Sequence, residues 1–300
     1  MNSLILQKQE VVIALAQFDI KDAVLKKCLL KEDETVITVP DGVTTIGKDA
    51  LCGLQSVIAV TLPESLKVIN DGAFYGCSSL TSVTLPGSVE RLGSCAFAQC
   101  STLNKIYLDN KLTEIGNSAF WGCTSLESID IPEGVTKIGY NLFGSCLSLI
   151  SVSLPDTVTE LDERAFKECT SLACITLPDS LTKIGNMAFL NCHNLKSVNI
   201  PDRLESIGEK AFFMCESLHE LEIPDGIASV GGDAFSDCVS VTVRSTISGK
   251  PLYKAVTATD GSSAYNFILR NIWDKGGFDF TAQDNYFPAL QDENLQYAIA

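Results

Sequence analysis

Cysteine and histidine are the residue types in this sequence that could catalyse a reaction or hold a metal ion. The chain of 300 residues contains twelve cysteines and two histidines. His193 and His219 occupy different places in a repeated pattern, and neither has a repeated acidic partner. The His-Glu-x-x-His motif of zinc enzymes, the Gly-x-Ser-x-Gly elbow of hydrolases and phosphate-binding glycine loops do not occur. We therefore expect no enzymatic activity, no catalytic residue, no metal site and no cofactor.

Most of the cysteines recur at a fixed spacing of 23 residues. These eight are Cys77, Cys100, Cys123, Cys146, Cys169, Cys192, Cys215 and Cys238. Such regularity predicts a ladder of small, buried, reduced thiols, although strands stacked about 4.8 Å apart would allow an occasional strained disulfide bond. Cys95 and Cys174 lie outside the ladder, and either is a candidate reactive thiol. Four residues separate each of them from a ladder cysteine, a wider spacing than zinc clusters use.

The 23-residue period extends across the middle of the chain. Proline marks it at positions 40, 63, 86, 132, 155, 178, 201 and 224, and Asp109 stands at the one remaining position of the series. A period of this size is typical of a solenoid, in which each turn buries its apolar face only against its neighbours. We predict that residues 36–243 form one elongated repeat domain of about nine turns.

Residues 63–85 illustrate one turn. The apolar positions, which recur at the same offsets in nearly every other turn, are Leu66, Ile69, Ala73, Phe74, Cys77, Leu80, Val83 and Leu85. The alternation from residue 80 to residue 85 predicts a strand with one buried face, and the following proline ends it because proline lacks an N–H group. We expect one short strand per turn, paired in parallel with its neighbours in a single long sheet.

The stretch Gly-x-x-Ala-Phe-x-x-Cys also occurs once in most turns. Its spacing of Ala, Phe and Cys predicts a short helical or 3₁₀ segment on the wall opposite the sheet. The glycine before it suits a corner with positive φ, and Asn70 and Asp162 replace this glycine in two turns. We expect the phenylalanines of this stretch to form a buried aromatic spine. They are Phe74, Phe97, Phe120, Phe143, Phe166, Phe189, Phe212 and Phe235.

The repeated pattern Leu-Pro-x-x-Leu-x-x-Ile-Gly-x-x-Ala-Phe-x-x-Cys-x-x-Leu, as in residues 177–195, resembles that of the BspA-like leucine-rich-repeat family. Members of this family are common among bacterial surface proteins. The resemblance covers residues 36–243. It implies an α/β repeat solenoid that is a right-handed, curved or gently twisted coil, and a role in adhesion or protein binding. It implies no catalytic residues.

The two ends of the chain fall outside the repeat. In residues 1–35, Asp19 and Asp22 before an apolar run predict an N-capped amphipathic helix, which we expect to cap the open first turn of the solenoid. Residues 244–300 are rich in aromatic residues. We expect them to form either a C-terminal cap over the last turn or the start of a further helical region.

The composition limits the partners that the protein can have. A formal net charge of -15 and a pI near 4.5 argue against nucleic acid and anionic membranes, which bind clustered Lys and Arg. No stretch approaches the roughly 20 apolar residues of a membrane span, and we recognise no export signal in the chain. The thiol-rich core is compatible with the cytoplasm, whereas the family resemblance implies the cell surface or secretion. We expect a monomer.

A partner would bind outward positions that vary from turn to turn. On the outer face of the predicted strands, most residues are small and carry a hydroxyl group, and the exceptions are Lys105, Tyr107 and Asp130. A tyrosine flanked by charges is typical of protein interfaces. The function we expect is that of a non-enzymatic scaffold which binds a protein or glycan ligand, or acts in adhesion, through its exposed faces.

A second set of candidate contact residues lies on the opposite wall. Tyr75, Trp121 and Phe213 follow the spine phenylalanine and should be partly exposed. They have an alternative role, which is to pack against the C-terminal tail. The alternative function is an intracellular assembly module whose aromatic tail docks on a partner or on a missing downstream domain.

Overall fold

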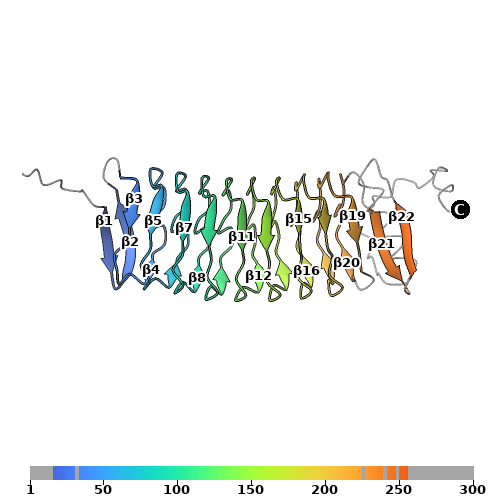
Figure 1. The fold of residues 1–300 in the computed structure, drawn as a ribbon, viewed down its shortest axis with the longest axis horizontal. Helices are drawn as coiled ribbons and strands as arrows, with labels where there is room; N and C mark the ends of the chain where they lie inside the picture. Colours follow the sequence, from blue (N-terminus) through green and yellow to red (C-terminus); the bar gives the residue numbers. More distant parts are fainter. Residues whose placement is uncertain (1–15, 31–33, 225–226, 239–241, 248–249, 256–300) are drawn as a thin grey trace, which may run out of the picture.

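The computed structural model describes residues 16–30, 34–224, 227–238, 242–247 and 250–255. Over these residues the chain forms an elongated stack of coils whose strands lie across the long axis (Figure 1). Equivalent residues of neighbouring coils are 23 positions apart, as in the pairing of Ser82 with Lys105. The predicted parallel-strand solenoid is therefore confirmed.

One row of strands lies where the sequence predicts it, and we call its outer surface the strand face. The strands are β3 (Val36–Thr38), β5 (Ala59–Thr61), β7 (Ser82–Thr84), β9 (Lys105–Tyr107), β11 (Ser128–Asp130), β13 (Ser151–Ser153), β15 (Cys174–Ile175), β17 (Ser197–Val198) and β19 (Glu220–Glu222). Most neighbours in this row pair in parallel. The expected single long sheet is wrong, because β9 does not pair with β11 and β13 does not pair with β15.

Each coil contains a second short strand that the sequence did not predict. This second row consists of β4 (Thr45–Ile46), β6 (Val68–Ile69), β8 (Arg91–Leu92), β10 (Glu114–Ile115), β12 (Lys137–Ile138), β14 (Glu160–Leu161), β16 (Lys183–Ile184), β18 (Ser206–Ile207) and β20 (Ser229–Val230). These strands also pair in parallel, with an interruption between β10 and β12. The expectation of one strand per turn is therefore wrong. A strand of two residues is too short to show an alternating pattern in the sequence.

The wall opposite the strands is built from consecutive turns. No helix occurs in the part of the chain that the structure describes, so the predicted helical or 3₁₀ wall is wrong. Two residues per coil adopt positive φ, such as Ser118 (56°) and Gly122 (72°), and this conformation interrupts a right-handed helical run. Wall amides bond instead to the next coil, as in the 2.8 Å bond from the Phe97 N–H to the Ala119 carbonyl.

The repeated glycine has a different role from the one we predicted. Gly47 and Gly185 do not adopt positive φ, and neither Asn70 nor Asp162 does. A Cβ on Gly185 would lie 2.6 Å from the carbonyl carbon of Asp162 on the preceding coil. Glycine is thus selected by the close approach of two backbones, and the predicted positive-φ corner is wrong.

The core is a continuous stack of side chains. The eight spine phenylalanines are fully buried, and neighbouring rings stack with centroids 4.8 to 6.0 Å apart. All twelve cysteines are free thiols. Each ladder thiol donates a hydrogen bond to a carbonyl of the preceding coil, as in the 3.1 Å contact from Cys100 Sγ to Phe74 O. The ladder therefore satisfies buried carbonyl groups without disulfide bonds.

Both described ends of the stack are hairpins. The predicted N-terminal helix is wrong for residues 17–29, which form the antiparallel strands β1 (Gln17–Lys21) and β2 (Val24–Leu29). Asp22 and Ala23 turn the chain with φ of 54° and 59°, and β2 then pairs in parallel with β4. At the other end, β21 (Thr242–Ile247) pairs with β19 and with β22 (Lys250–Ala255). The predicted tail from residue 256 onwards lies outside the described residues.

Candidate partner-binding surfaces

The first candidate surface lies on the strand face, at β9 and β11. Lys105 and Tyr107 flank the buried Ile106 on β9, so both side chains point outward. Tyr107 is 54% exposed, which is a large fraction for an aromatic side chain. Asp130 is the residue of β11 equivalent to Tyr107, and it is also exposed.

Two of these three residues form a contact pair. Lys105 Nζ lies 4.7 Å from the centroid of the Tyr107 ring, within range of a cation–π interaction. The pKa of Lys105 is raised, first by its hydrogen bond with the Tyr107 side chain. Within the described residues no ion pair links Asp130 to Lys105, so the acid is free to interact separately.

The residues around this pair have small, polar side chains. The neighbouring strands present exposed hydroxyl side chains at the same positions. These are Ser82, Thr84, Ser128, Ser151 and Ser153. A single exposed ring with one cation beside it and one carboxylate nearby can bind a ligand by stacking, charge and hydrogen bonds. Lys105, Tyr107 and Asp130 include no nucleophile with an adjacent base.

The second candidate surface does not form a continuous patch. Tyr75 is 38% exposed, whereas Trp121 and Phe213 are half-buried. Tyr75 and Trp121 occupy equivalent positions two coils apart, and the coil between them has the buried Ala98. Phe213 lies four coils beyond Trp121, and the first coil between them has Gly144 at the equivalent position. The structure therefore leaves these three aromatic residues separate.

Sequence reasoning missed an apolar corner beside the strand face. Leu147 is 43% exposed and Ile150 is 55% exposed on the turn that leads into β13. The positions equivalent to residue 150 in the two preceding coils carry Glu127 and Asn104. A large aliphatic residue at a position that is polar in most coils is the signal that could have identified this corner, and Ile58 is the other such residue.

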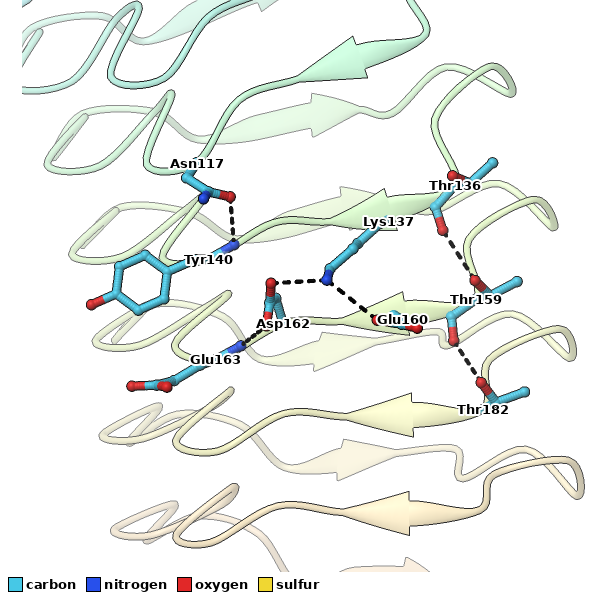
Figure 2. Close-up of polar contacts among 9 residues, drawn as sticks. All are labelled: Asn117, Thr136, Lys137, Tyr140, Thr159, Glu160, Asp162, Glu163 and Thr182. Atoms are coloured by element: carbon cyan, nitrogen blue, oxygen red, sulfur yellow. Dashed lines mark hydrogen bonds and ion pairs between the residues drawn. The ribbon is translucent and has the colours of Figure 1, made fainter.

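Charged side chains along the second row make a series of contacts between coils. Lys137 Nζ lies 3.3 Å from a carboxylate oxygen of Glu160 and 3.0 Å from one of Asp162 (Figure 2). Arg91 pairs with Glu114 at 3.0 Å in the same row of positions. These side chains are about a third to three-fifths exposed, so each pair contributes at most about 1 kcal/mol to stability.

Among the described residues, the histidines and cysteines are not assembled into a reactive site. No group of three or more His, Cys, Asp or Glu side chains is placed to hold a metal ion in the described ranges. His193 lies alone beside Glu216, with 3.6 Å between Nδ1 and a carboxylate oxygen. Burial and the nearby Asp71 raise the pKa of Cys95, whereas a reactive thiol needs a lowered pKa.

The described residues also contain no helix with the length and apolar composition needed to cross a membrane.

A stack of parallel-strand coils with a leucine-rich core and exposed polar faces defines a leucine-rich-repeat solenoid. The chain belongs to the BspA-type leucine-rich-repeat family, whose six-copy region model matches residues 19–150 and 137–250. Repeat proteins of this kind are commonly protein-binding scaffolds. No curated protein matches the sequence.

Two solved structures show the same architecture. A leucine-rich cell surface protein from Faecalibacterium prausnitzii is 30% identical with a TM-score of 0.61, over 77% of this chain and 74% of that chain. A leucine-rich-repeat protein from Bacteroides ovatus is 23% identical with a TM-score of 0.52, over 78% of this chain and 81% of that chain. The second likeness concerns the fold alone.

Proposed function

We propose that this protein is a non-enzymatic adhesion scaffold that binds a protein or glycan ligand through the strand face around Lys105, Tyr107 and Asp130. The observation that carries the proposal is the 54% exposure of Tyr107 among small hydroxyl side chains. Burying such a ring against a partner would remove it from water, and the fixed cation beside it would orient the partner.

A location at the cell surface accompanies this proposal. It is supported by the similarity to the F. prausnitzii protein, which is described as a leucine-rich cell surface protein. A surface protein meets other proteins and glycans outside the cell, and a long stack of coils presents an extended face to them.

The test uses purified full-length protein against immobilised mucin, fibronectin, collagen and a glycan array. We expect at least one probe to bind. Tyr107→Thr restores the residue type found at this position in β5 and β7, and should weaken that binding by more than about tenfold because anchor residues contribute about 2 kcal/mol or more. Asp130→Ser should also weaken it.

Thr84→Ser and Ser153→Ala are matched controls on the same face and should leave the affinity unchanged. Binding that ignores Tyr107→Thr and Asp130→Ser would contradict the proposed site. Binding that disappears only when residues 256–300 are deleted would favour the alternative role of the tail as the docking element.

A further inference from the structure

One interface in the middle of the solenoid is held differently from all the others described. We divide the stack into coils that begin at the first residue of each strand of the strand face, such as coil 82–104, coil 105–127, coil 128–150 and coil 151–173. The interface between coils 105–127 and 128–150 lacks both rows of strand pairing, because neither β9 with β11 nor β10 with β12 is paired. We call it the central interface.

The interfaces on either side have both rows intact. Coil 82–104 pairs with coil 105–127 through β7 with β9 and through β8 with β10. Coil 128–150 pairs with coil 151–173 through β11 with β13 and through β12 with β14. Loss of both rows at once is therefore confined to the central interface within the described coils.

The missing pairing corresponds to missing hydrogen bonds between backbones. On one side, the Gly116 N–H donates to the Leu92 carbonyl at 2.8 Å. On the other side, the Asp162 N–H donates to the Ile138 carbonyl at 2.8 Å. The equivalent bond across the central interface, from the Gly139 N–H, is not formed between these described residues.

Some side-chain contacts that join other coils are also missing at this interface, although the Tyr140 N–H still donates to the Asn117 Oδ1 at 3.1 Å (Figure 2). The hydroxyl of Thr182 donates to the Thr159 carbonyl at 3.2 Å and that of Thr159 to the Thr136 carbonyl at 3.3 Å (Figure 2). Among the described residues the Thr136 hydroxyl forms no such bond, whereas that of Thr113 donates to the Glu90 carbonyl at 3.4 Å. The ion pairs of the second row lie on either side, and none joins Glu114 to Lys137 among the residues described.

A further contact is missing at the corner between the two rows. At equivalent positions, the hydroxyl of Ser88 donates to the Leu66 carbonyl at 2.6 Å and that of Thr157 to the Val135 carbonyl at 2.9 Å. At the central interface this position is Gly134, which has no hydroxyl, and at the preceding interface it is Lys111, so this contact is missing at both.

The wall remains intact at the same interface. The Ser118 N–H donates to the Tyr140 carbonyl at 2.9 Å, and Cys146 Sγ donates to the Phe120 carbonyl at 3.2 Å. The Phe120 ring lies 6.0 Å from the ring before it and 5.7 Å from the ring after it, the two widest separations in the spine. The two coils are thus joined along the wall and at the residue before the strand face, where the Ile150 N–H donates to the Glu127 carbonyl at 2.8 Å. Neither row of strands joins them.

We propose that the central interface is a flex point that divides the solenoid into two cooperative blocks, one ending at residue 127 and one beginning at residue 128. The contacts that remain act as the hinge, and the unpaired strands of the two rows are free to move relative to each other. In a stack stabilised by contacts between neighbours, cooperativity is lost first at the weakest interface.

The flex point lies directly beneath the candidate binding surface. Tyr107 is on β9 at one side of the central interface, and Asp130 is on β11 at the other. If the proposed function holds, a ligand that contacts both residues spans the two blocks and fixes their relative angle. The flex point itself does not depend on that function.

Hydrogen exchange of the full-length protein, followed by mass spectrometry with fragmentation to single residues, tests the flex point. The amides of Thr136 and Gly139 should exchange at least about tenfold faster than those of Thr159 and Asp162, because only the latter pair is bonded to the preceding coil. The wall amide of Phe120 should remain protected. Equal protection of the two pairs would overturn the proposal.

Two matched substitutions test the division into blocks. Phe97→Ala and Phe166→Ala each remove a ring one coil away from the coils that flank the central interface. Phe97→Ala should speed exchange at Gly116 but not at Asp162, and Phe166→Ala should do the reverse. If either substitution speeds exchange equally on both sides of the central interface, the solenoid is a single cooperative unit and the proposal is wrong. If neither variant folds, the exchange pattern of the unmodified protein decides.

Discussion

A phenylalanine in the spine contacts a ring on the coil before it and a ring on the coil after it. Phe143 is fully buried, and its ring centroid lies 5.7 Å from that of Phe120 and 5.4 Å from that of Phe166. Phe143→Ala should lower the free energy of unfolding by about 3–5 kcal/mol, because it leaves a cavity that neighbouring coils fill only partly. Urea titration measures the change, and the control Tyr75→Ala should cost less than about 1 kcal/mol.

The carboxylate of Glu168 contributes to the pH dependence of the free energy of unfolding. Its carboxylate accepts a 2.7 Å hydrogen bond from the Ser145 hydroxyl, which lowers its pKa, with a smaller effect from Lys167. The folded pKa lies below the ordinary value of 4.5, so ionised Glu168 stabilises the fold above that pH. This stabilisation is lost as the pH falls through the folded pKa.

Glu168→Gln should therefore reduce the fall in the free energy of unfolding between about pH 6 and about pH 3.5. The reduction should be below about 1 kcal/mol because the carboxylate is partly exposed. Urea titrations at both pH values measure it, with the exposed Glu133→Gln as control. A steeper fall in the variant would contradict this role.

The cysteines should differ sharply in their reactivity. Burial raises the pKa of Cys123 and Cys192 to about 12, whereas Cys52 and Cys174 are exposed. A thiol reagent at neutral pH should modify Cys52 and Cys174 in the folded protein and reach the ladder thiols only after denaturation. Peptide mapping by mass spectrometry identifies the modified sites. Equal rates for all twelve thiols would contradict a buried ladder.

At the scale of the structural elements, neighbouring glycines illustrate how closely the coils approach. A Cβ on Gly231 would lie 2.6 Å from the Glu209 Cα of the preceding coil, whereas one on Gly232 would meet nothing within 4 Å. Gly231→Ala should lower the free energy of unfolding by about 1–3 kcal/mol, and Gly232→Ala should change it by less than about 0.5 kcal/mol. Thermal or urea unfolding measures both. Equal effects of the two substitutions would contradict the close approach of the two backbones at Gly231.

The strand face and the core were predictable from the sequence because they repeat with a buried residue at every second position. The second row of strands was not predictable, since each strand has one buried residue, such as Ile69 in β6. The wall was mistaken for a helix because Ala, Phe and Cys recur at spacings that suit one helical face. The residues that prevent a helix there, such as Ser118 and Arg164, adopt positive φ without being glycine.

The N-terminal hairpin shows a similar limit. Asp22 resembles a helix cap in the sequence, but it lies in the turn between β1 and β2. Leu25 and Cys28 of β2 are buried, and Leu25 pairs with Ile46 on the next coil. Pairing with the existing strand row determines the conformation of this segment, and contacts so distant in sequence leave no local signal.

At the scale of the whole molecule, the two groups of candidate contact residues chosen from the sequence differ in how closely their members lie together in the structure. Lys105 and Tyr107 form a contact pair on one strand, as residues two apart on a strand can. Tyr75, Trp121 and Phe213 remain separate, because equivalent positions on distant coils never meet in a stack. The coincidence of the missing contacts at the central interface had no signal in the sequence beyond Asp109 in place of proline and Gly134 in place of a hydroxyl residue.

The hairpins at the two ends have a consequence for how such proteins change over generations. Within the described residues they close the stack with strands of their own, so the coils between the hairpins contact only neighbouring coils or a hairpin. A gene that gains or loses an in-frame unit encoding 23 residues lengthens or shortens the rod by about 4.8 Å while every remaining junction keeps its contacts. The length of the solenoid can therefore change during evolution by one coil at a time.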